Sequence, residues 1–234
     1  MNNNNIFCMK LNNIFTIILI CVAVFFAACD DMNDLHIDYL KEGETIYAAK
    51  VDSVSPGPGN ERIEMELFIK AQRIEFLRFF WNAGSDSVDY NINNQVGIFK
   101  CMIVGLPENE YLFNVVSFDK FGNKSLPFEV SAVSYGEYYR GYLTNRRVTA
   151  ALTDSLRLTF AAPLDEVIYS TLYYLNSSNA NVTKVVPADV EKVTIPDFKQ
   201  GSEFRYTTTY RPAENSPDTF TSDEATGNFP TIAP

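Results

Sequence analysis

One strand-like pattern occurs twice in the chain at a constant spacing. Residues Arg62–Leu67 alternate polar and apolar side chains, and residues Ser155–Phe160 repeat that alternation 93 positions later. A period of two is typical of a strand buried on one face. The same spacing, without a gap, relates Ile74 to Val167, Phe76 to Tyr169, Phe79 to Leu172, Trp81 to Tyr174, Tyr111 to Phe204 and Phe113 to Tyr206. A unit of this length predicts a sandwich of seven strands, present in two tandem copies.

The repeat divides the chain into two β-domains and a linker. We place the first domain at residues 45–135, the linker at 136–146 and the second domain at 147–234. Strands of the first domain are expected at residues 49–55, 62–68, 73–82, 87–92, 97–104, 111–119 and 128–135. Pro56–Gly59 should end the first of these strands, because proline and glycine interrupt regular structure. Neither copy has a long helical periodicity, so the predicted fold class is all-β.

The charge balance and the scarcity of histidine argue against several classes of function. The chain has 19 Lys and Arg against 29 Asp and Glu, which gives a formal net charge of −10. A nucleic-acid partner is not expected, since phosphate neutralisation needs clustered basic side chains. The chain has 1 histidine, which argues against most hydrolase triads and most histidine-based metal sites. We expect no catalytic residue, no metal and no cofactor, and we predict that the protein is not an enzyme.

The first 28 residues have the pattern of a targeting segment. An apolar run at residues 14–28 follows Lys10 and is shorter than the roughly 20 residues that a spanning helix needs. It ends in Phe26-Ala27-Ala28-Cys29, which resembles the lipobox of bacterial lipoproteins. The resemblance implies cleavage before Cys29 and a lipid anchor on that cysteine. A simple membrane anchor or a plain secretion signal is the alternative, and Met9 is an alternative start to Met1.

The residues after Cys29 form an acidic tether, placed at 29–44. Asp30-Asp31-Met32-Asn33-Asp34 resembles the surface-export signal of Bacteroidota lipoproteins, which implies an outer-membrane protein exposed at the cell surface. Cleavage and lipidation would leave Cys101 as the remaining cysteine, so no intrachain disulfide is expected. Because Cys101 lies in a strand-like run with no accompanying base, we predict a buried, inert thiol.

The segment Leu106–Val115 resembles the sixth strand of fibronectin type III domains. In that family a leucine and a proline precede a tyrosine at the head of an alternating strand, and Tyr111 would form such a tyrosine corner. Trp81 and Leu67 fall where the family has core residues, and Phe204 replaces the tyrosine in the second copy. The mature chain also resembles a family of Bacteroidota surface lipoproteins with two fibronectin-like domains, in segments 40–47, 118–123 and 145–147. That family has no established activity.

Four tyrosines in the linker have helical spacing. Tyr135, Tyr138, Tyr139 and Tyr142 stand at relative positions 0, 3, 4 and 7, so a short helix would place them on one side. The favoured interpretation is a seam that packs the two domains together, with the hydroxyls reaching water. The alternative is an aromatic platform for sugar rings.

Two further patterns carry weaker hypotheses. The acidic residues Asp86, Asp89, Asp165-Glu166 and Asp223-Glu224 lack the spacing of a calcium loop, and solvated surface charge is the expected role. Ser53, Ser87 and Ser155 each follow an aspartate and precede an apolar residue, which resembles the acceptor of Bacteroidota O-glycosylation. Turns before strands also favour Asp and Ser, so a structural role is the alternative.

Together these features predict a non-catalytic, lipid-anchored cell-surface protein with a binding or accessory role. The expected partner is a glycan or another envelope protein, because sandwich folds display their loops at both ends. A purely structural spacer or assembly component is the first alternative. A carbohydrate-active enzyme is the second, and it would need convergent carboxylates that the sequence does not indicate.

Overall fold

Strands make up almost all of the regular structure in the computed structural model, which describes residues 46–152 and 156–231. Residues from Tyr47 onward belong to one compact unit. None of the described residues forms a helix long and apolar enough to cross a bilayer. The predicted signal peptide, Cys29, the acidic tether and Ser155 lie outside the described residues.

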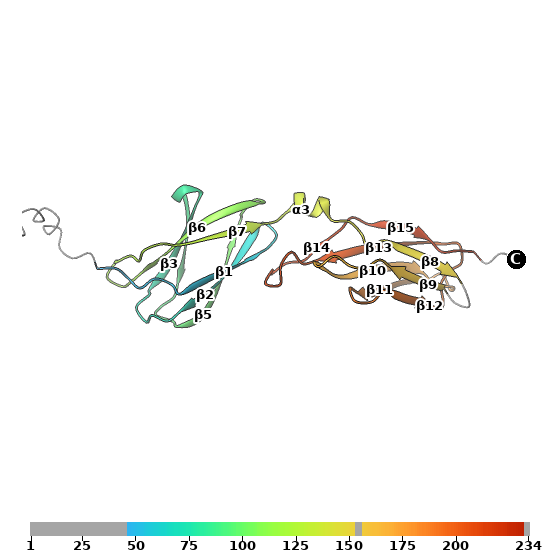
Figure 1. The fold of residues 1–234 in the computed structure, drawn as a ribbon, viewed down its shortest axis with the longest axis horizontal. Coiled ribbons are helices and arrows are strands. Elements are labelled where there is room, and N and C mark those ends of the chain that lie inside the picture. The colour runs from blue at the N-terminus through green and yellow to red at the C-terminus, as the bar shows by residue number, and fades with distance from the viewer. Residues whose placement is uncertain (1–45, 153–155, 232–234) are drawn as a thin grey trace, which may run out of the picture. The chain divides into compact units, whose positions relative to one another are not determined.

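The first half of this unit is a sandwich of two antiparallel sheets (Figure 1). One sheet has the order β1-β2-β5 and the other the order β4-β3-β6-β7. The strands are β1 (Ser53–Pro58), β2 (Arg62–Ile69), β3 (Phe76–Trp81), β4 (Asp86–Asn91), β5 (Gly97–Val104), β6 (Asn109–Phe118) and β7 (Phe128–Ser134), with a 3-10 turn η1 (Asn82–Gly84) after β3. Each of the seven predicted strands is therefore present, with ends displaced by a few residues.

The second half repeats this scheme. Its sheets have the orders β12-β9-β8 and β11-β10-β13-β14, and β15 also pairs with β13. The strands are β8 (Val148–Leu152), β9 (Leu156–Phe160), β10 (Val167–Leu175), β11 (Asn181–Pro187), β12 (Lys192–Ile195), β13 (Glu203–Tyr210), β14 (Phe220–Thr221) and β15 (Ala225–Asn228). The same neighbours pair in both halves, so the predicted fold class of two tandem fibronectin type III-like sandwiches is confirmed.

The constant spacing of 93 residues is wrong for part of the second copy. Phe79 pairs with Val115, whereas its counterpart Leu172 pairs with Tyr206, so β6 and β13 correspond at a spacing of 91. By this register Phe204 corresponds to Phe113 and not to Tyr111. Loops absorb such length differences, because their backbone lies outside the paired strands.

Each sandwich encloses its own apolar core, as the alternation predicts. In the first, the fully buried side chains include Met65, Leu67, Phe79 and Phe113, and Trp81 packs against them at the edge. In the second, Leu158, Phe160 and Leu172 occupy the centre.

Strand β1 contradicts the expectation that Pro56–Gly59 would end it. It begins at Ser53 and continues through Pro58, paired with β2 along its whole length. Gly59 donates its N–H to the carbonyl of Arg62. Because N–H groups alternate sides along a strand, the nitrogens of Pro56 and Pro58 point away from β2, and an edge strand tolerates proline there.

The tyrosine corner is present in the first sandwich. The hydroxyl of Tyr111 donates to the carbonyl of Pro107 at 2.8 Å. Cys101 is buried on the inner face of β5, and desolvation raises the pKa of its thiol to about 12. A thiol of that pKa is almost entirely protonated near neutral pH, which agrees with the predicted inert cysteine.

Candidate functional site

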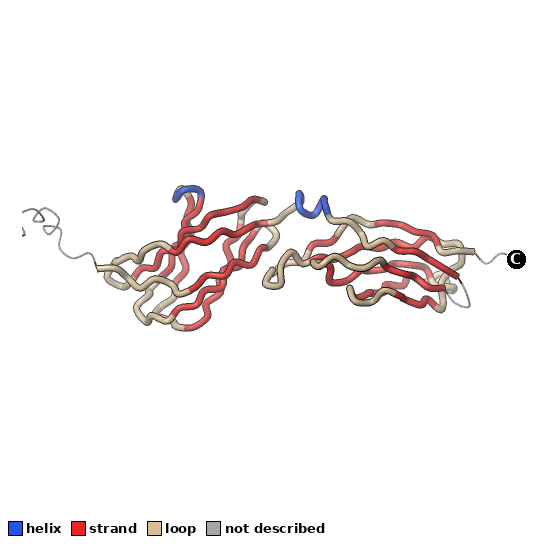
Figure 2. Tube along the Cα trace, in the orientation of Figure 1, coloured by secondary structure: helices blue, strands red, loops and turns tan. Residues whose placement is uncertain are grey.

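The linker contains a short helix, α3 (Glu137–Tyr142), between β7 and β8 (Figure 2). The carboxylate of Glu108 accepts the backbone N–H groups of Tyr138 at 2.8 Å and of Tyr139 at 2.7 Å. These N–H groups have no partner within a helix, so a carboxylate from the preceding sandwich satisfies them. Glu108 therefore ties the start of α3 to the turn before β6.

The four linker tyrosines divide into two pairs rather than sharing one side. Tyr135 and Tyr139 are half-buried, with ring centroids 4.3 Å apart, and both meet the ring of Phe220 edge to face. The hydroxyl of Tyr139 donates to Glu166 at 2.7 Å. Burial and then this hydrogen bond raise the pKa of Tyr139 above its usual value. These two rings lie between elements of both halves, as a packing seam requires.

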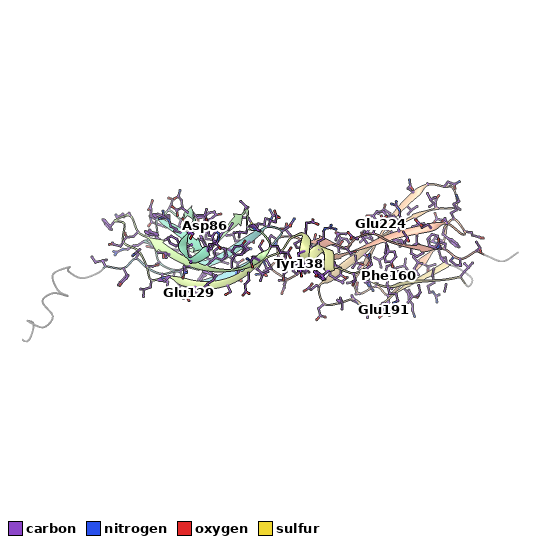
Figure 3. The ribbon with its side chains drawn as sticks, turned by 90° about the horizontal axis from the view of Figure 1, so that it is seen from above. Asp86, Glu129, Tyr138, Phe160, Glu191 and Glu224 are labelled. Atoms are coloured by element: carbon purple, nitrogen blue, oxygen red, sulfur yellow. The ribbon has the colours of Figure 1, made fainter. Side chains whose placement is uncertain are left out.

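Tyr138 and Tyr142 form the other pair and lie on the surface. Their side chains are 72% and 67% exposed, their ring centroids are 4.8 Å apart, and their hydroxyls are 3.0 Å apart. Figure 3 labels Tyr138 on the linker helix. The helix begins at Glu137, so Tyr135 precedes it, and Tyr139 is turned about 100° from Tyr138. For that reason the helical spacing does not bring all four rings together.

A second set of contacts joins β1 and β2 to the loop after β13. Asp218 accepts both Nε of Arg62, at 2.8 Å, and Nη2 of Arg62, and also the backbone N–H of Asn60 at 2.9 Å. Asn215 Nδ2 donates to the carbonyl of Pro56 at 2.9 Å, and Ser216 donates to that of Pro58 at 2.5 Å. A Cβ atom on Gly57 would overlap the backbone of Asn215, so glycine is required at this close approach.

We expect Arg62→Ala and Asp218→Ala to be coupled. A double-mutant cycle on the free energy of urea unfolding should give a coupling energy of about 1–2 kcal/mol, because the pair is bidentate and Asp218 is mostly shielded from water. The exposed pair Lys70–Asp52 is the control, with less than about 0.5 kcal/mol expected. Equal coupling in the two cycles would contradict the assignment.

The stabilisation that the Arg62–Asp218 pair contributes should depend on pH in the acid range. Hydrogen bonds from Arg62 lower the pKa of Asp218 below its ordinary value of 3.8. Its contribution is therefore complete above that ordinary value and is lost as the pH falls through the lowered pKa. The coupling energy should accordingly be constant from neutral pH down to the ordinary value of 3.8, and it should fall progressively as the pH is lowered further.

Most of the acidic residues singled out in the sequence accept hydrogen bonds from other side chains. Asp86 accepts Asn82 Nδ2 at 2.6 Å, and Asp89 pairs with Arg78, whose hydrogen bonds lower the pKa of Asp89. Asp165 lies exposed in a turn. Glu166 accepts Tyr139, Asp223 accepts Arg140 and Glu224 accepts Arg205. Among the described residues no three His, Cys, Asp or Glu side chains form a group that could hold a metal ion.

The described residues include two of the three candidate O-glycosylation serines. Ser53 is exposed at the start of β1, and Ser87 is exposed on the edge strand β4. The preceding carboxylates make structural contacts, since Asp52 accepts the N–H of Lys70 and Asp86 accepts Asn82.

A shallow pocket lies on the sheet formed by β10, β11 and β13, and sequence reasoning did not find it. Its volume is about 380 Å³. Its lining includes Tyr173, Asn181, Thr183, Glu203 and Arg205. The guanidinium of Arg205 lies over one face of the Tyr173 ring, 6.0 Å from its centroid, and pairs with Glu224. The pocket thus combines an aromatic ring with several polar side chains, and the alternation in β10 was its only signal in the sequence.

Several solved structures of fibronectin type III domains are similar to the chain. One of them contains the FN1-FN3 domains of chicken CNTN1, with 12% sequence identity and a TM-score of 0.42. That match covers 79% of this chain and 66% of the CNTN1 chain. The chain is also similar to a segment of two fibronectin type III domains from chicken tenascin, with 12% sequence identity and a TM-score of 0.32. That match covers 78% of this chain and 100% of the tenascin segment. A third similar structure contains the fibronectin(III)-like modules of Clostridium thermocellum CbhA, with 11% sequence identity and a TM-score of 0.35. That match covers 78% of this chain and 93% of the CbhA chain. No curated protein matches the chain.

One family model matches most of the chain. It is the model of DUF4998, a domain of unknown function, and it matches residues 29–220. The match begins at the candidate lipidation residue Cys29 and runs through both sandwiches to the start of β14. The protein therefore belongs to the DUF4998 family.

Proposed function

We propose that this protein is a non-catalytic binding or accessory lipoprotein, held at the outer surface of the outer membrane by acyl chains on Cys29. The lipobox-like residues 26–29, the acidic residues after them and the likeness to Bacteroidota surface lipoproteins support the anchor. Several acyl chains hold a protein on a membrane far more firmly than one chain does. The fibronectin type III-like fold supports a binding role only in that it displays loops and sheet faces to a partner.

The observation that carries the binding role is the exposed pair Tyr138 and Tyr142. Neither ring contributes to the core, and both stand on a helix whose first turn is held by Glu108. Arg140 fixes the same helix to Asp223 at 2.8 Å. Rings presented on a fixed support lose little conformational entropy when a partner binds, so such an arrangement favours recognition.

A glycan is the partner that these rings favour. The face of a phenol ring carries partial negative charge and attracts the C–H groups of a sugar ring, while the hydroxyls supply hydrogen bonds. The alternative partner is another envelope protein, which would use the same exposed rings as anchors. The net charge of −10 disfavours a nucleic acid.

A second candidate function is that of a spacer. The contacts that favour it are those of Asn60 and Arg62 with Asp218, and those of Asn215 and Ser216 with β1, because they join one half of the chain to the other without a ligand. A spacer of this kind needs the seam and gains nothing from two exposed phenol rings.

The test uses the full chain, purified in detergent and applied to an array of bacterial and host glycans. We expect selective binding that falls at least ten-fold in the variant Tyr138→Ala/Tyr142→Ala, with no change in the thermal melting curve. Leu164→Ala, a substitution at another exposed apolar residue, is the matched control. Absence of binding to every glycan would overturn the glycan role, and capture of an envelope protein through the same tyrosines would assign the rings to that partner.

The anchor is tested separately in cells. We expect Cys29→Ser to move the protein out of the membrane fraction and to abolish incorporation of a labelled fatty acid. A Cys29→Ser protein that stays in the outer membrane would contradict lipid anchoring.

A further inference from the structure

We propose that the pocket on β10, β11 and β13 is a binding site for a neutral saccharide. This inference rests on the proposed binding role and adds a place in the second sandwich and a ligand class. The pocket volume of about 380 Å³ lies within the range of small-molecule sites.

The strand register places an aromatic ring between two polar side chains. Tyr173 on the central strand β10 pairs with Thr183 of β11 on one side and with Arg205 of β13 on the other. Directly paired residues project from the same face of a sheet, so these three side chains stand in a row. In the pairing between β10 and β11, Leu175 and Asn181 stand two positions beyond, on the same face.

The polar side chains of the pocket are available to a ligand. Within residues 46–152 and 156–231, the side chains of Tyr173, Asn181, Thr183 and Glu203 make no hydrogen bond to another residue, whereas Ser202 is committed to the carbonyl of Lys199 at 2.7 Å. The available groups comprise two hydroxyls, an amide and a carboxylate, which together both donate and accept. A ligand rich in hydroxyl groups matches such a set, since each sugar hydroxyl also donates and accepts.

The charges select a neutral ligand. Arg205 is the positive group of the pocket, and it already pairs with Glu224 at 3.2 Å, while Glu203 adds a second carboxylate. The local balance is therefore one negative charge, in a chain whose formal net charge is −10. An anionic ligand would be repelled, but a neutral one is not. Arg205 lies over one face of the Tyr173 ring, and this half-buried ring offers its remaining exposed surface to the C–H groups of a pyranose.

The experiment titrates the full chain in detergent with four neutral oligosaccharides, namely maltohexaose, cellohexaose, xylohexaose and mannohexaose, and with heparin hexasaccharide as an anionic probe. We expect at least one neutral probe to bind the wild type. Tyr173→Ala should weaken that binding at least ten-fold, and Asn181→Ala, at an exposed residue, by about three- to ten-fold. Phe80→Ala is the matched control, because Phe80 occupies the corresponding place on β3 of the first sandwich.

The outcomes separate the site from the general role. Neutral binding that is unaffected by both Tyr173→Ala and Asn181→Ala would overturn the pocket, while the proposed glycan role would stand. Binding of heparin hexasaccharide alone would overturn the ligand class. Binding of none of the probes here or on the array would overturn the glycan role and the pocket together. Far-UV circular dichroism of each variant ensures that a loss of binding reflects the site and not unfolding.

Discussion

Replacing Arg146 by alanine is expected to lower the free energy of unfolding of the second sandwich by about 3–5 kcal/mol. Arg146 is 5% exposed at the start of that sandwich. Its guanidinium donates to the carbonyls of Ala161 at 2.8 and 3.0 Å, of Pro187 at 3.3 Å and of Val190 at 3.3 Å. It also lies over the ring of Phe160, 5.2 Å from the centroid (Phe160 is labelled in Figure 3).

The size of this effect follows from burial. Desolvation lowers the pKa of Arg146, which means that the carbonyl groups must compensate a charge removed from water. Alanine would leave three carbonyls without these donors and would open a cavity beside Phe160, and both changes are costly. The substitution is measured by urea denaturation followed by far-UV circular dichroism, which reports both sandwiches.

Two further variants sharpen the result. Arg147→Ala removes the neighbouring, exposed arginine and should change stability by less than about 0.5 kcal/mol. Arg146→Lys keeps the charge, but a single ammonium cannot reach all three carbonyls, which lie on two separate segments, so an intermediate loss is expected. A loss below about 1 kcal/mol in Arg146→Ala would show that the carbonyl contacts do not stabilise the fold.

Replacing Phe113 by alanine is expected to destabilise the first sandwich by about 3–5 kcal/mol. The side chain is 0% exposed, and its ring centroid lies 5.7 Å from that of Trp81 and 5.9 Å from that of Tyr111. Removing the ring leaves a cavity that strands β3 and β6 cannot close, because both are held by their ladder hydrogen bonds. Trp81 is the single tryptophan of the sequence and lies in the first sandwich, so its fluorescence reports the unfolding of that sandwich selectively.

The neighbouring residue provides the control for Phe113. Leu112 is 55% exposed on the opposite face of β6, so Leu112→Ala should change stability by less than about 0.5 kcal/mol. Similar losses in the two variants would contradict the division of β6 into a core face and a solvent face.

Local patterns in the sequence predicted those features that depend on strand alternation. Arg62–Leu67 and the strands after it were recognisable because side chains on successive residues must point to opposite faces. Cys101 was interpretable for the same reason, since a thiol within a strand-like run favours burial. The role of Tyr111 was predicted from the resemblance to fibronectin type III domains, and its hydrogen bond to Pro107 confirms the tyrosine corner.

Other features depend on residues that are far apart in the chain. Proline in β1 is tolerated because Pro56 and Pro58 face away from β2, which is known only when the partner strand is known. Asp218 and Arg62 are 156 positions apart, and neither carries a local signature of its partner. The spacing between the copies changes from 93 to 91 residues because a loop differs in length. Apolar alternation does not reveal this change, since a shift of two residues keeps every side chain on the same face of its strand.

By itself the sequence determined that this protein consists of two copies of one β-sandwich, because burial of one sheet face imposes a period of two that is visible in single residues. Only the tertiary structure decided which exposed groups meet. Tyr139 packs against Phe220, whereas Tyr138 is exposed to water. Tyr173, Thr183 and Arg205 lie in one row across three paired strands. The physical reason is that alternation specifies the face of a strand on which a side chain lies, whereas strand register and loop length specify its neighbours.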